Sequence, residues 1–355
     1  MFRKISEGKV FATRADNYFA SGSRTAILPD GRYICAYNRE SASGVNDFVP
    51  MVSYSKDGEN WSESRELWPE FVGKKCISIS VRNTDDGRIA ICGWAADIAY
   101  PGEVWWSDEL AAMKENQILF SISDDGYNFP SPTFIDLPYY GAAEIPGGMH
   151  VDREGRIYIV YSPYRTIEGR EETDVNCLVM LRSTDGGKTF EASKIGCVSG
   201  ESQYAETWIA ELSSGDKMIT TWQTASNDAP DQYLYSKDGI HFDGPYPLPF
   251  KGQTTALTPL SDGRVMIAYN QRKEKPVGIW IAVARPDETG LNLIENAPVW
   301  EAKVASGDGD FANWTSFSYG EPHALEMLDG RYLLVYWYEQ DGERGIGYSI
   351  LEYEG

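Results

Sequence analysis

A short motif, Ser-x-Asp-Gly followed closely by an aromatic residue, occurs four times in this chain. Its copies begin at Ser55, Ser123, Ser183 and Ser236, and they close with Trp61, Phe129, Phe190 and Phe242. Each copy has the chemistry of a tight hairpin turn, because Asp and Ser side chains bond nearby backbone amides and Gly supplies a positive φ. Four copies at similar spacing predict a fold made of repeated β units.

A second turn repeat, mostly of the Asp-Gly-Arg kind, runs in phase with the first and occurs six times. Its glycines are Gly31, Gly87, Gly155, Gly215, Gly263 and Gly330. Apolar runs after these turns, such as 33–37, 265–269 and 332–336, have the length and composition of strands. One sixth of the chain is about 59 residues, enough for four strands and their loops. We therefore predict an all-β, six-bladed β-propeller that forms one domain over residues 1–355.

The two ends of the repeat differ from the rest. The fifth Ser-x-Asp-Gly position is degenerate (residues 285–290), and the sixth unit ends at Gly355 without one. We expect residues 9–12 to supply the missing outer strand of the last blade and so to close the ring. Residues 108–114 depart from the β pattern, and we expect a short helix there, in an insertion between strands of the second blade.

Composition narrows the classes of partner. The formal net charge is −21, which disfavours binding to nucleic acid or to acidic membrane surfaces. No segment is apolar and long enough to span a bilayer, and residues 1–8 run on without the apolar segment of a signal peptide. We therefore expect a cytoplasmic protein. Five cysteines without metal-ligand spacing (Cys35, Cys76, Cys92, Cys177 and Cys197) predict buried free thiols.

The propeller register locates a candidate site. The inner strand of each blade starts at one mouth of the central funnel and runs to its Asp-Gly-Arg turn, so residues seven to nine before or after each turn glycine should line the funnel. Counting back selects Arg24, Ser78, Ser80, Gly148 with His150 nearby, Glu206, Thr254, Glu321 and His323. Counting forward selects Asn38, Arg39, Trp94, Ser162, Tyr164, Trp222, Asn270, Arg272 and Trp337. Acids, arginines and indoles in one funnel suit a sugar, which stacks on aromatic faces and bonds to charged groups.

The repeated turns, with residues 23–28 before the first Asp-Gly-Arg turn and 205–212 before the fourth, resemble the Asp-box glycoside hydrolases of the sialidase (neuraminidase) superfamily. The resemblance covers essentially the whole chain. It implies that Arg24 binds a substrate carboxylate, that Asp47 is the acid/base, and that Glu206 polarises the nucleophile. No cofactor and no metal are implied.

Two departures from the family pattern change the expected substrate. Where the resemblance implies a second carboxylate-binding arginine, this chain has Trp222, and Arg272 is a loose match to a further member of the triad. Where it implies a nucleophilic tyrosine, the chain has Glu321, with Tyr319 two residues earlier. Glu as nucleophile or base and Trp as a stacking platform are what a less acidic sugar than sialic acid would require.

The sequence therefore predicts an exo-acting glycoside hydrolase that is not a typical sialidase. Asp47 is the expected acid, Glu321 the nucleophile or base and Glu206 its neighbour. Arg24, Arg272, Trp222, His150, His323, Tyr319 and Trp94 are expected to bind the carbohydrate. Hydrogen-bonding roles are favoured over metal binding for the two histidines. Glu144 and Glu201, in loops at the same mouth, are alternatives to the chosen acids. A sialidase proper and a non-catalytic carbohydrate-binding propeller remain the alternative functions.

Overall fold

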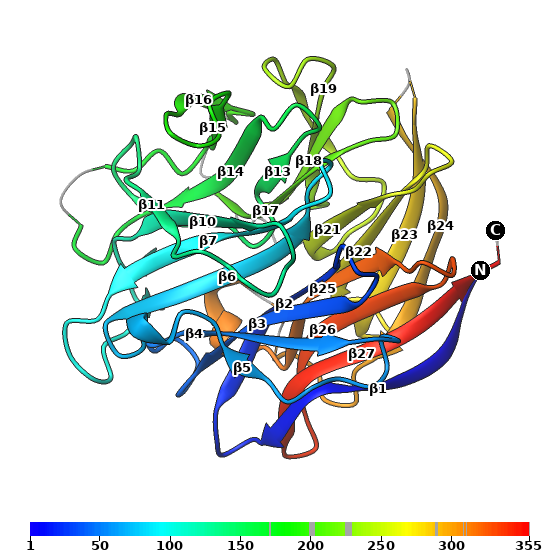
Figure 1. Ribbon diagram of the computed structural model, residues 1–355, viewed down its shortest axis with the longest axis horizontal. Helices are drawn as coiled ribbons and strands as arrows, with labels where there is room; N and C mark the ends of the chain where they lie inside the picture. The colour runs from blue at the N-terminus through cyan, green and yellow to red at the C-terminus, as the bar shows by residue number, and fades with distance from the viewer. Residues whose placement is uncertain are drawn as a thin grey trace.

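Six antiparallel sheets form a six-bladed β-propeller in the computed structural model, as the repeats predict (Figure 1). The structure describes residues 1–169, 172–198, 203–223, 229–287, 290–307, 309 and 311–354. Within these residues there is no α-helix, and the helical turns are two short 3-10 segments, η1 (Pro69–Phe71) and η2 (Phe311–Ser316). None of the described helical segments is long and apolar enough to cross a membrane. The predicted Glu201 lies outside the described residues.

The first three blades follow one another along the chain. The first contains β2 (Phe19–Ile27), β3 (Tyr33–Glu40), β4 (Val49–Ser55) and β5 (Arg65–Glu66). The second contains β6 (Lys75–Asn83), β7 (Ile89–Asp97), β10 (Gln117–Ser123) and β11 (Thr133–Ile135), with the small hairpin β8 (Trp106–Ser107) and β9 (Ala112–Met113) inserted. The third contains β12 (Ala142–Glu144), β13 (Met149–Val151), β14 (Ile157–Tyr164), β15 (Leu178–Ser183) and β16 (Glu191–Ile195).

The last three blades complete the ring. The fourth contains β17 (Tyr204–Glu211), β18 (Lys217–Gln223), β19 (Gln232–Ser236) and β20 (Asp243–Pro247). The fifth contains β21 (Gln253–Pro259), β22 (Val265–Gln271), β23 (Gly278–Asp287) and β24 (Gly290–Glu301). The sixth contains β25 (Tyr319–Glu326), β26 (Tyr332–Gln340), β27 (Glu343–Tyr353) and, as its outer strand, β1 (Phe2–Arg14).

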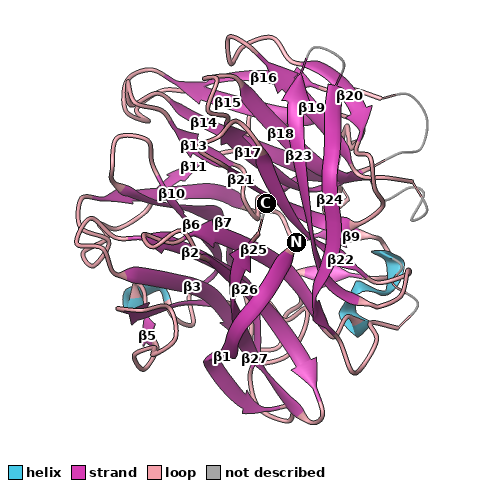
Figure 2. Ribbon diagram, turned by 90° about the vertical axis from the view of Figure 1, so that its right-hand side faces the viewer, coloured by secondary structure: helices cyan, strands magenta, loops and turns pink. Residues whose placement is uncertain are grey.

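The N-terminal strand closes the ring. β1 pairs antiparallel with β27 from Phe2 opposite Tyr353 to Arg14 opposite Glu343, so the expected segment 9–12 lies within a longer strand. The two termini lie side by side, and the Met1 ammonium group donates to the Glu354 carbonyl at 2.6 Å (Figures 1 and 2). The N-terminal strand β1 and the C-terminal strand β27 thus lie in one sheet. Their pairing stabilises the closed ring because the backbone groups on the edges that face each other are hydrogen-bonded.

The four Ser-x-Asp-Gly turns share one hydrogen-bond pattern at the end of the third strand of blades one to four. In the first, Ser55 donates to Asp57 Oδ1 at 3.0 Å, and Asp57 Oδ1 accepts the Asn60 backbone N–H at 2.7 Å. These N–H donors favour the ionised carboxylate, so they hold the pKa of Asp57 well below its usual range. The same applies to Asp125, Asp185 and Asp238. The turns are therefore structural elements of the blade edges.

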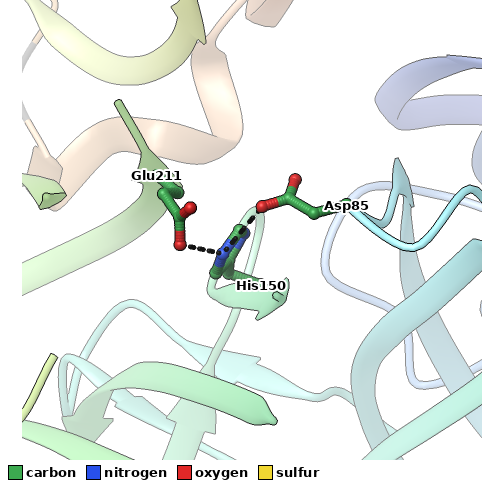
Figure 3. A group of neighbouring side chains, drawn as sticks. All are labelled: Asp85, His150 and Glu211. Atoms are coloured by element: carbon green, nitrogen blue, oxygen red, sulfur yellow. Dashed lines mark hydrogen bonds and ion pairs between the residues drawn. The ribbon is translucent and has the colours of Figure 1, made fainter. Parts of the chain in front are cut away.

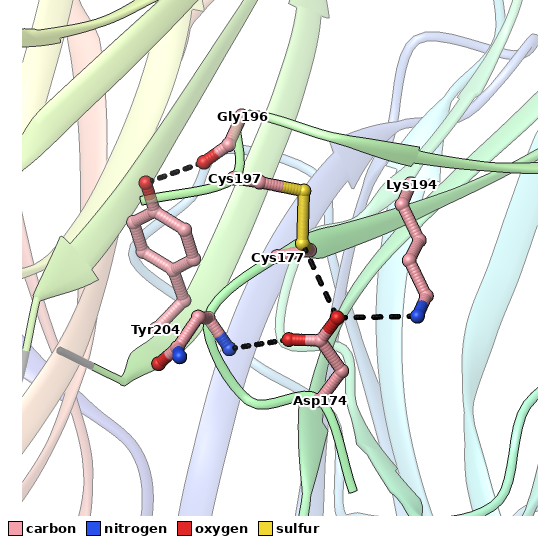
Figure 4. Close-up of a disulfide and its surroundings, with 7 residues drawn as sticks. Asp174, Cys177, Lys194, Gly196, Cys197 and Tyr204 are labelled. Carbon is pink, nitrogen blue, oxygen red and sulfur yellow. Dashed lines mark hydrogen bonds and ion pairs between the residues drawn. A yellow bond between two sulfur atoms is a disulfide. The ribbon is translucent and has the colours of Figure 1, made fainter. Parts of the chain in front are cut away.

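Two sequence expectations are wrong. Residues 108–114 form no helix, because Trp106 pairs with Met113 in the β8–β9 hairpin and both side chains are buried. A seven-residue helix is too short to be stable alone, so these buried contacts decide the local structure. The cysteines are also not all free: Cys177 and Cys197 form a disulfide that joins the start of β15 to the end of β16 (Figure 4). Cys35, Cys76 and Cys92 are buried free thiols.

Candidate active site

The mouth at which the inner strands begin holds a cavity of about 120 Å³. Its wall combines carboxyl groups, one arginine and many aromatic rings drawn from all six blades and from two loops. The lining residues are Phe19, Ser21, Asn38, Glu40, Phe48, Ser78, Trp94, Trp105, Trp106, Met113, Glu144, Tyr164, Ala205, Glu206, Trp222, Thr254, Arg272, Trp314, Phe317, Glu321 and Trp337. Ten of these were selected by counting from the turn glycines.

A repeated β-bulge places side chains in this cavity. The residues nine before the turn glycines of blades four, five and six all have left-handed backbone: φ is 46° at Glu206, 51° at Thr254 and 47° at Glu321. In each case the pairing register of the inner strand shifts at that residue. A bulge redirects the side chain of the extra residue, and positive φ in a residue other than Gly is strained and gathers at functional sites. The bulge thus explains why Glu206 and Glu321 reach one cavity.

The first blade carries the same bulge with a glycine in place of the side chain. Gly22, nine residues before Gly31, has φ 70°, and its N–H donates to Glu321 Oε2 at 2.7 Å. A Cβ at this position would lie 2.4 Å from the Asn38 amide nitrogen. The glycine therefore allows the backbone of the first blade to approach the carboxylate of the sixth closely.

Glu321 has a hydrogen-bond donor at each carboxyl oxygen. Its Oε2 accepts the Gly22 N–H at 2.7 Å, its Oε1 accepts from Arg24 Nη2 at 3.5 Å, and its side chain is 19% exposed. An N–H donor and a guanidinium both stabilise the charged form of a carboxyl. These donors therefore suit Glu321 to act as a carboxylate in the wall of the cavity.

Glu206 has the opposite environment. Burial, followed by the negative charge of Glu321, raises the pKa of Glu206 to about 7, while a hydrogen bond from Thr254 Oγ1 and the charge of Arg272 lower it. Burial disfavours the ionised carboxylate, and a like charge nearby does so as well. Glu206 and Glu321 thus share one cavity but differ in surroundings: Glu206 is buried beside a like charge, whereas Glu321 accepts hydrogen bonds from an N–H and a guanidinium.

Two further carboxyls complete the acidic set. Burial raises the pKa of Glu144 well above its usual range, and the charges of Glu206 and Glu321 add to this. Burial also raises the pKa of Glu40 well above its usual range. Glu144 was an alternative in the sequence analysis, whereas Glu40 was missed. It lies nine residues after Gly31, so the forward count that selected Asn38 and Arg39 could have included it.

The two predicted arginines are engaged with protein atoms. Arg24 is 1% exposed and does not line the cavity. Its Nε donates to the Pro146 carbonyl at 3.0 Å, and Nη1 donates to the Ser23 and Glu321 carbonyls. Arg272 lines the cavity, but its Nη1 donates to Gln253 Oε1 at 2.9 Å and its Nη2 to the Tyr319 carbonyl at 2.7 Å. Arg24 is thus committed to protein atoms away from the cavity, whereas Arg272 has both Nη atoms bonded to protein and its Nε without a hydrogen-bond partner.

Aromatic rings form the rest of the wall. Trp222 and Trp94, both predicted, line the cavity. Three tryptophans were missed because they lie outside the inner strands from which residues were counted: Trp105 and Trp106 in the second-blade insertion and Trp314 in η2. Trp105 and Trp314, from the second-blade insertion and from η2, approach to 5.1 Å between ring centroids, and Figure 2 shows η2 beside β9.

Three predicted residues lie next to the cavity without lining it. Asp47 is half-buried, and its Oδ1 accepts the Ser41 backbone N–H at 3.1 Å. Tyr319 is fully buried, and its hydroxyl donates to the Gln271 carbonyl at 2.8 Å. His323 accepts the Thr25 N–H at 3.2 Å, and burial lowers its pKa well below the usual value, so the ring is neutral. The structure thus brings Glu206 and Glu321 together in the cavity but leaves these three outside its wall.

His150 lies at the opposite end of the inner strands, close to the turns. Its Nε2 is 3.4 Å from Glu211 Oε2 and 3.6 Å from Asp85 Oδ2 (Figure 3). Among the described residues, these three side chains form a group whose ligand atoms lie close enough together to hold a metal ion. Lys217 Nζ, at 3.0 Å, already pairs with Glu211. Burial raises the pKa of Asp85, and the nearby charges of His150 and Arg82 oppose that rise. The contacts are those of an ion-pair network, separate from the cavity.

Solved structures share this fold. A protein of unknown function from Dyadobacter fermentans superposes with a TM-score of 0.77 at 20% identity, covering 99% of both chains. An α-L-arabinofuranosidase from Fusarium graminearum gives 0.63 at 14%, covering 98% of this chain and 97% of that one. The NanB sialidase from Streptococcus pneumoniae gives 0.61 at 11%, covering 97% and 70%.

No protein-family model and no curated protein sequence matches the chain. At the identities of the solved structures, the similarity shows the fold alone. The chain is a six-bladed propeller of the architecture found in sialidases and in an arabinofuranosidase, and its chemistry has to be argued from its own cavity.

Proposed function

We propose that the protein is an exo-acting glycoside hydrolase that removes a terminal sugar other than sialic acid. The observation that carries the proposal is the pair of carboxyls Glu206 and Glu321, which share one cavity and differ in their surroundings: Glu206 is buried with a raised pKa, and Glu321 accepts the Gly22 N–H. Glycosidases need one carboxylic acid to protonate the leaving oxygen and one carboxylate to attack carbon or activate water. Environments that push two pKa values apart identify these roles.

The roles that we propose follow from the surroundings of the two carboxyls. Glu321, stabilised by the Gly22 N–H and by Arg24, is the nucleophile or base. Glu206, with a pKa raised to about 7, donates its proton to the glycosidic oxygen as the bond to the anomeric carbon breaks. This role passes to Glu206 from Asp47, our sequence-based choice, since the Asp47 carboxyl is bonded to the Ser41 backbone outside the cavity wall.

The shape and lining of the cavity support a small, uncharged or cationic terminal sugar. Ligand pockets for drug-sized molecules usually span about 300–1,000 Å³, so a cavity of about 120 Å³ suits one sugar ring. Trp94, Trp222 and Trp337 offer aromatic faces for its C–H groups. Arg24 does not line the cavity, and both Nη atoms of Arg272 already bond to protein atoms, which disfavours the bidentate contact that an anionic sugar would need.

A panel of nitrophenyl glycosides, including sialosides and uronic acid glycosides, tests the proposal. We expect hydrolysis of at least one neutral or amino-sugar glycoside, and much slower cleavage of sialosides. Binding of sugars without cleavage of any glycoside would favour a carbohydrate-binding propeller, which the aromatic wall would also serve. Efficient cleavage of sialosides would favour a sialidase proper.

A further inference from the structure

Glu40, at the end of β3, is a buried carboxyl in the cavity wall for which the proposed mechanism has no use. Glu40 is 2% exposed and lines the cavity. Its Oε2 accepts the indole N–H of Trp105 at 3.4 Å. Burying a carboxyl is costly unless it is paired or protonated, so its presence in this wall calls for a partner.

The protein itself supplies no cation to this carboxyl. Among the described residues, no Lys, Arg or His forms an ion pair with Glu40. The neighbouring charges are those of Asp47 and Glu321, which are also negative and raise the Glu40 pKa further. Arg39, next in sequence, pairs with Glu66 at 3.0 Å and lies over the Tyr18 ring. Among the described residues Glu40 thus has no cationic partner, and a cationic group of a ligand beside it would favour its ionised form.

Aromatic rings enclose the same wall. Phe19, Phe48, Trp105 and Trp337 all line the cavity. Phe48 lies 5.7 Å from Trp105 and Phe19 lies 5.3 Å from Trp337, between ring centroids. Ring faces attract cations, and they do so more strongly in sites from which water is excluded. A carboxyl surrounded by aromatic rings is the combination that proteins use to bind ammonium groups.

We propose that the Glu40 wall binds a protonated amino group of the ligand, so that the terminal sugar is an amino sugar. An ammonium group would lower the pKa of Glu40, pair with the resulting carboxylate and offset the repulsion from Asp47 and Glu321, whereas a hydroxyl would not. The choice of substrate rests on the proposed function. Binding of the amino sugar does not rest on the proposed function, because binding requires no hydrolysis.

Equilibrium binding of matched sugar pairs tests this inference. Glucosamine, galactosamine and mannosamine are each compared with the parent hexose near neutral pH and at equal ionic strength. The readouts are tryptophan fluorescence, which the indole-lined cavity should report, and calorimetry. We expect at least one amine to bind tenfold or more tightly than its hexose, and E40Q to bring the two affinities close to equal.

The matched control is E66Q, which removes a carboxylate from the same blade outside the cavity and should keep the preference. Melting curves check that each variant folds, and E40D, which retains the charge, should keep part of the preference if E40Q is unstable. Equal binding of every pair, absence of amine binding, or a preference that survives in E40Q would overturn the inference. Loss of hydrolysis alone would bear on the proposed function instead.

Discussion

The chemistry of the site depends on the contrast between two glutamates. Glu321 receives the Gly22 N–H at 2.7 Å and the guanidinium of Arg24, whereas Glu206 is buried beside that negative charge. The residue that differs from the sialidase pattern, Glu in place of Tyr, is therefore the one that accepts both of these donors. Arg24, which we expected to bind substrate, instead donates hydrogen bonds to the backbone carbonyl and the carboxyl group of Glu321.

The pH dependence of hydrolysis follows from Glu206. Because it must be protonated to donate, kcat/KM should fall as the pH rises through about 7, the raised pKa of Glu206. The hydrogen bond from Thr254 Oγ1 lowers that pKa, so T254V should move the basic limb to higher pH. A pH–rate profile of the two proteins measures this shift. An unchanged limb in T254V would show that another group donates the proton.

At the scale of elements, the turns and strands were predictable because their signals are local and repeated. The β8–β9 hairpin was not predictable, because Trp106 and Met113 are held by contacts with segments distant in the sequence. The disulfide was not, because Cys177 and Cys197 meet only when β15 and β16 pair. The direction of Arg24 depends on a register shift in β2, which the regular strand count cannot show.

The bulge in β2 gives a prediction at this scale. Gly22→Ala should lower both stability and activity, because its Cβ would lie 2.4 Å from the Asn38 amide and the backbone has φ 70°. The backbone strain alone is worth about 1–3 kcal/mol. Gly44→Ala is the matched control, with φ 85° and nothing within 4 Å of the added Cβ. Thermal melting and kcat/KM are measured together.

For Gly44→Ala we expect the loss of stability without the loss of activity. If Gly22→Ala retained full activity, the Gly22 N–H would not be needed to hold Glu321.

At the scale of the whole molecule, ring closure by β1 should govern stability. Removing residues 2–14 would leave the edge of β27 unpaired along Glu343–Tyr353, and such edges pair with other chains. We expect a lower melting temperature and self-association, measured by calorimetry and light scattering. As a control, K9A breaks one exposed ion pair with Glu343 and should cost about 1 kcal/mol or less. A truncated protein that melts like the full chain and stays monomeric would contradict this account.

The cavity was only partly predictable, for a reason that concerns the whole ring. Counting from six turns placed Glu206, Glu321 and Trp222 at one mouth because every blade repeats the same register. Trp314 belongs to no repeat, and it reaches the cavity from the 3-10 segment η2. The cytoplasmic location stays a prediction, and the Cys177–Cys197 bond is of a kind that persists mainly in oxidising compartments.

The most direct test of the central claim is the dependence of rate on leaving group in E206Q and E321Q. A dinitrophenolate leaves without a proton, whereas a poor leaving group needs one. We expect E206Q to lose about 10²–10⁴-fold on a glycoside with a poor leaving group and to keep most of its rate on the dinitrophenyl glycoside of the same sugar. E321Q should be inactive on both. Equal losses by E206Q on the two substrates, or an active E321Q, would contradict the assignment of these glutamates.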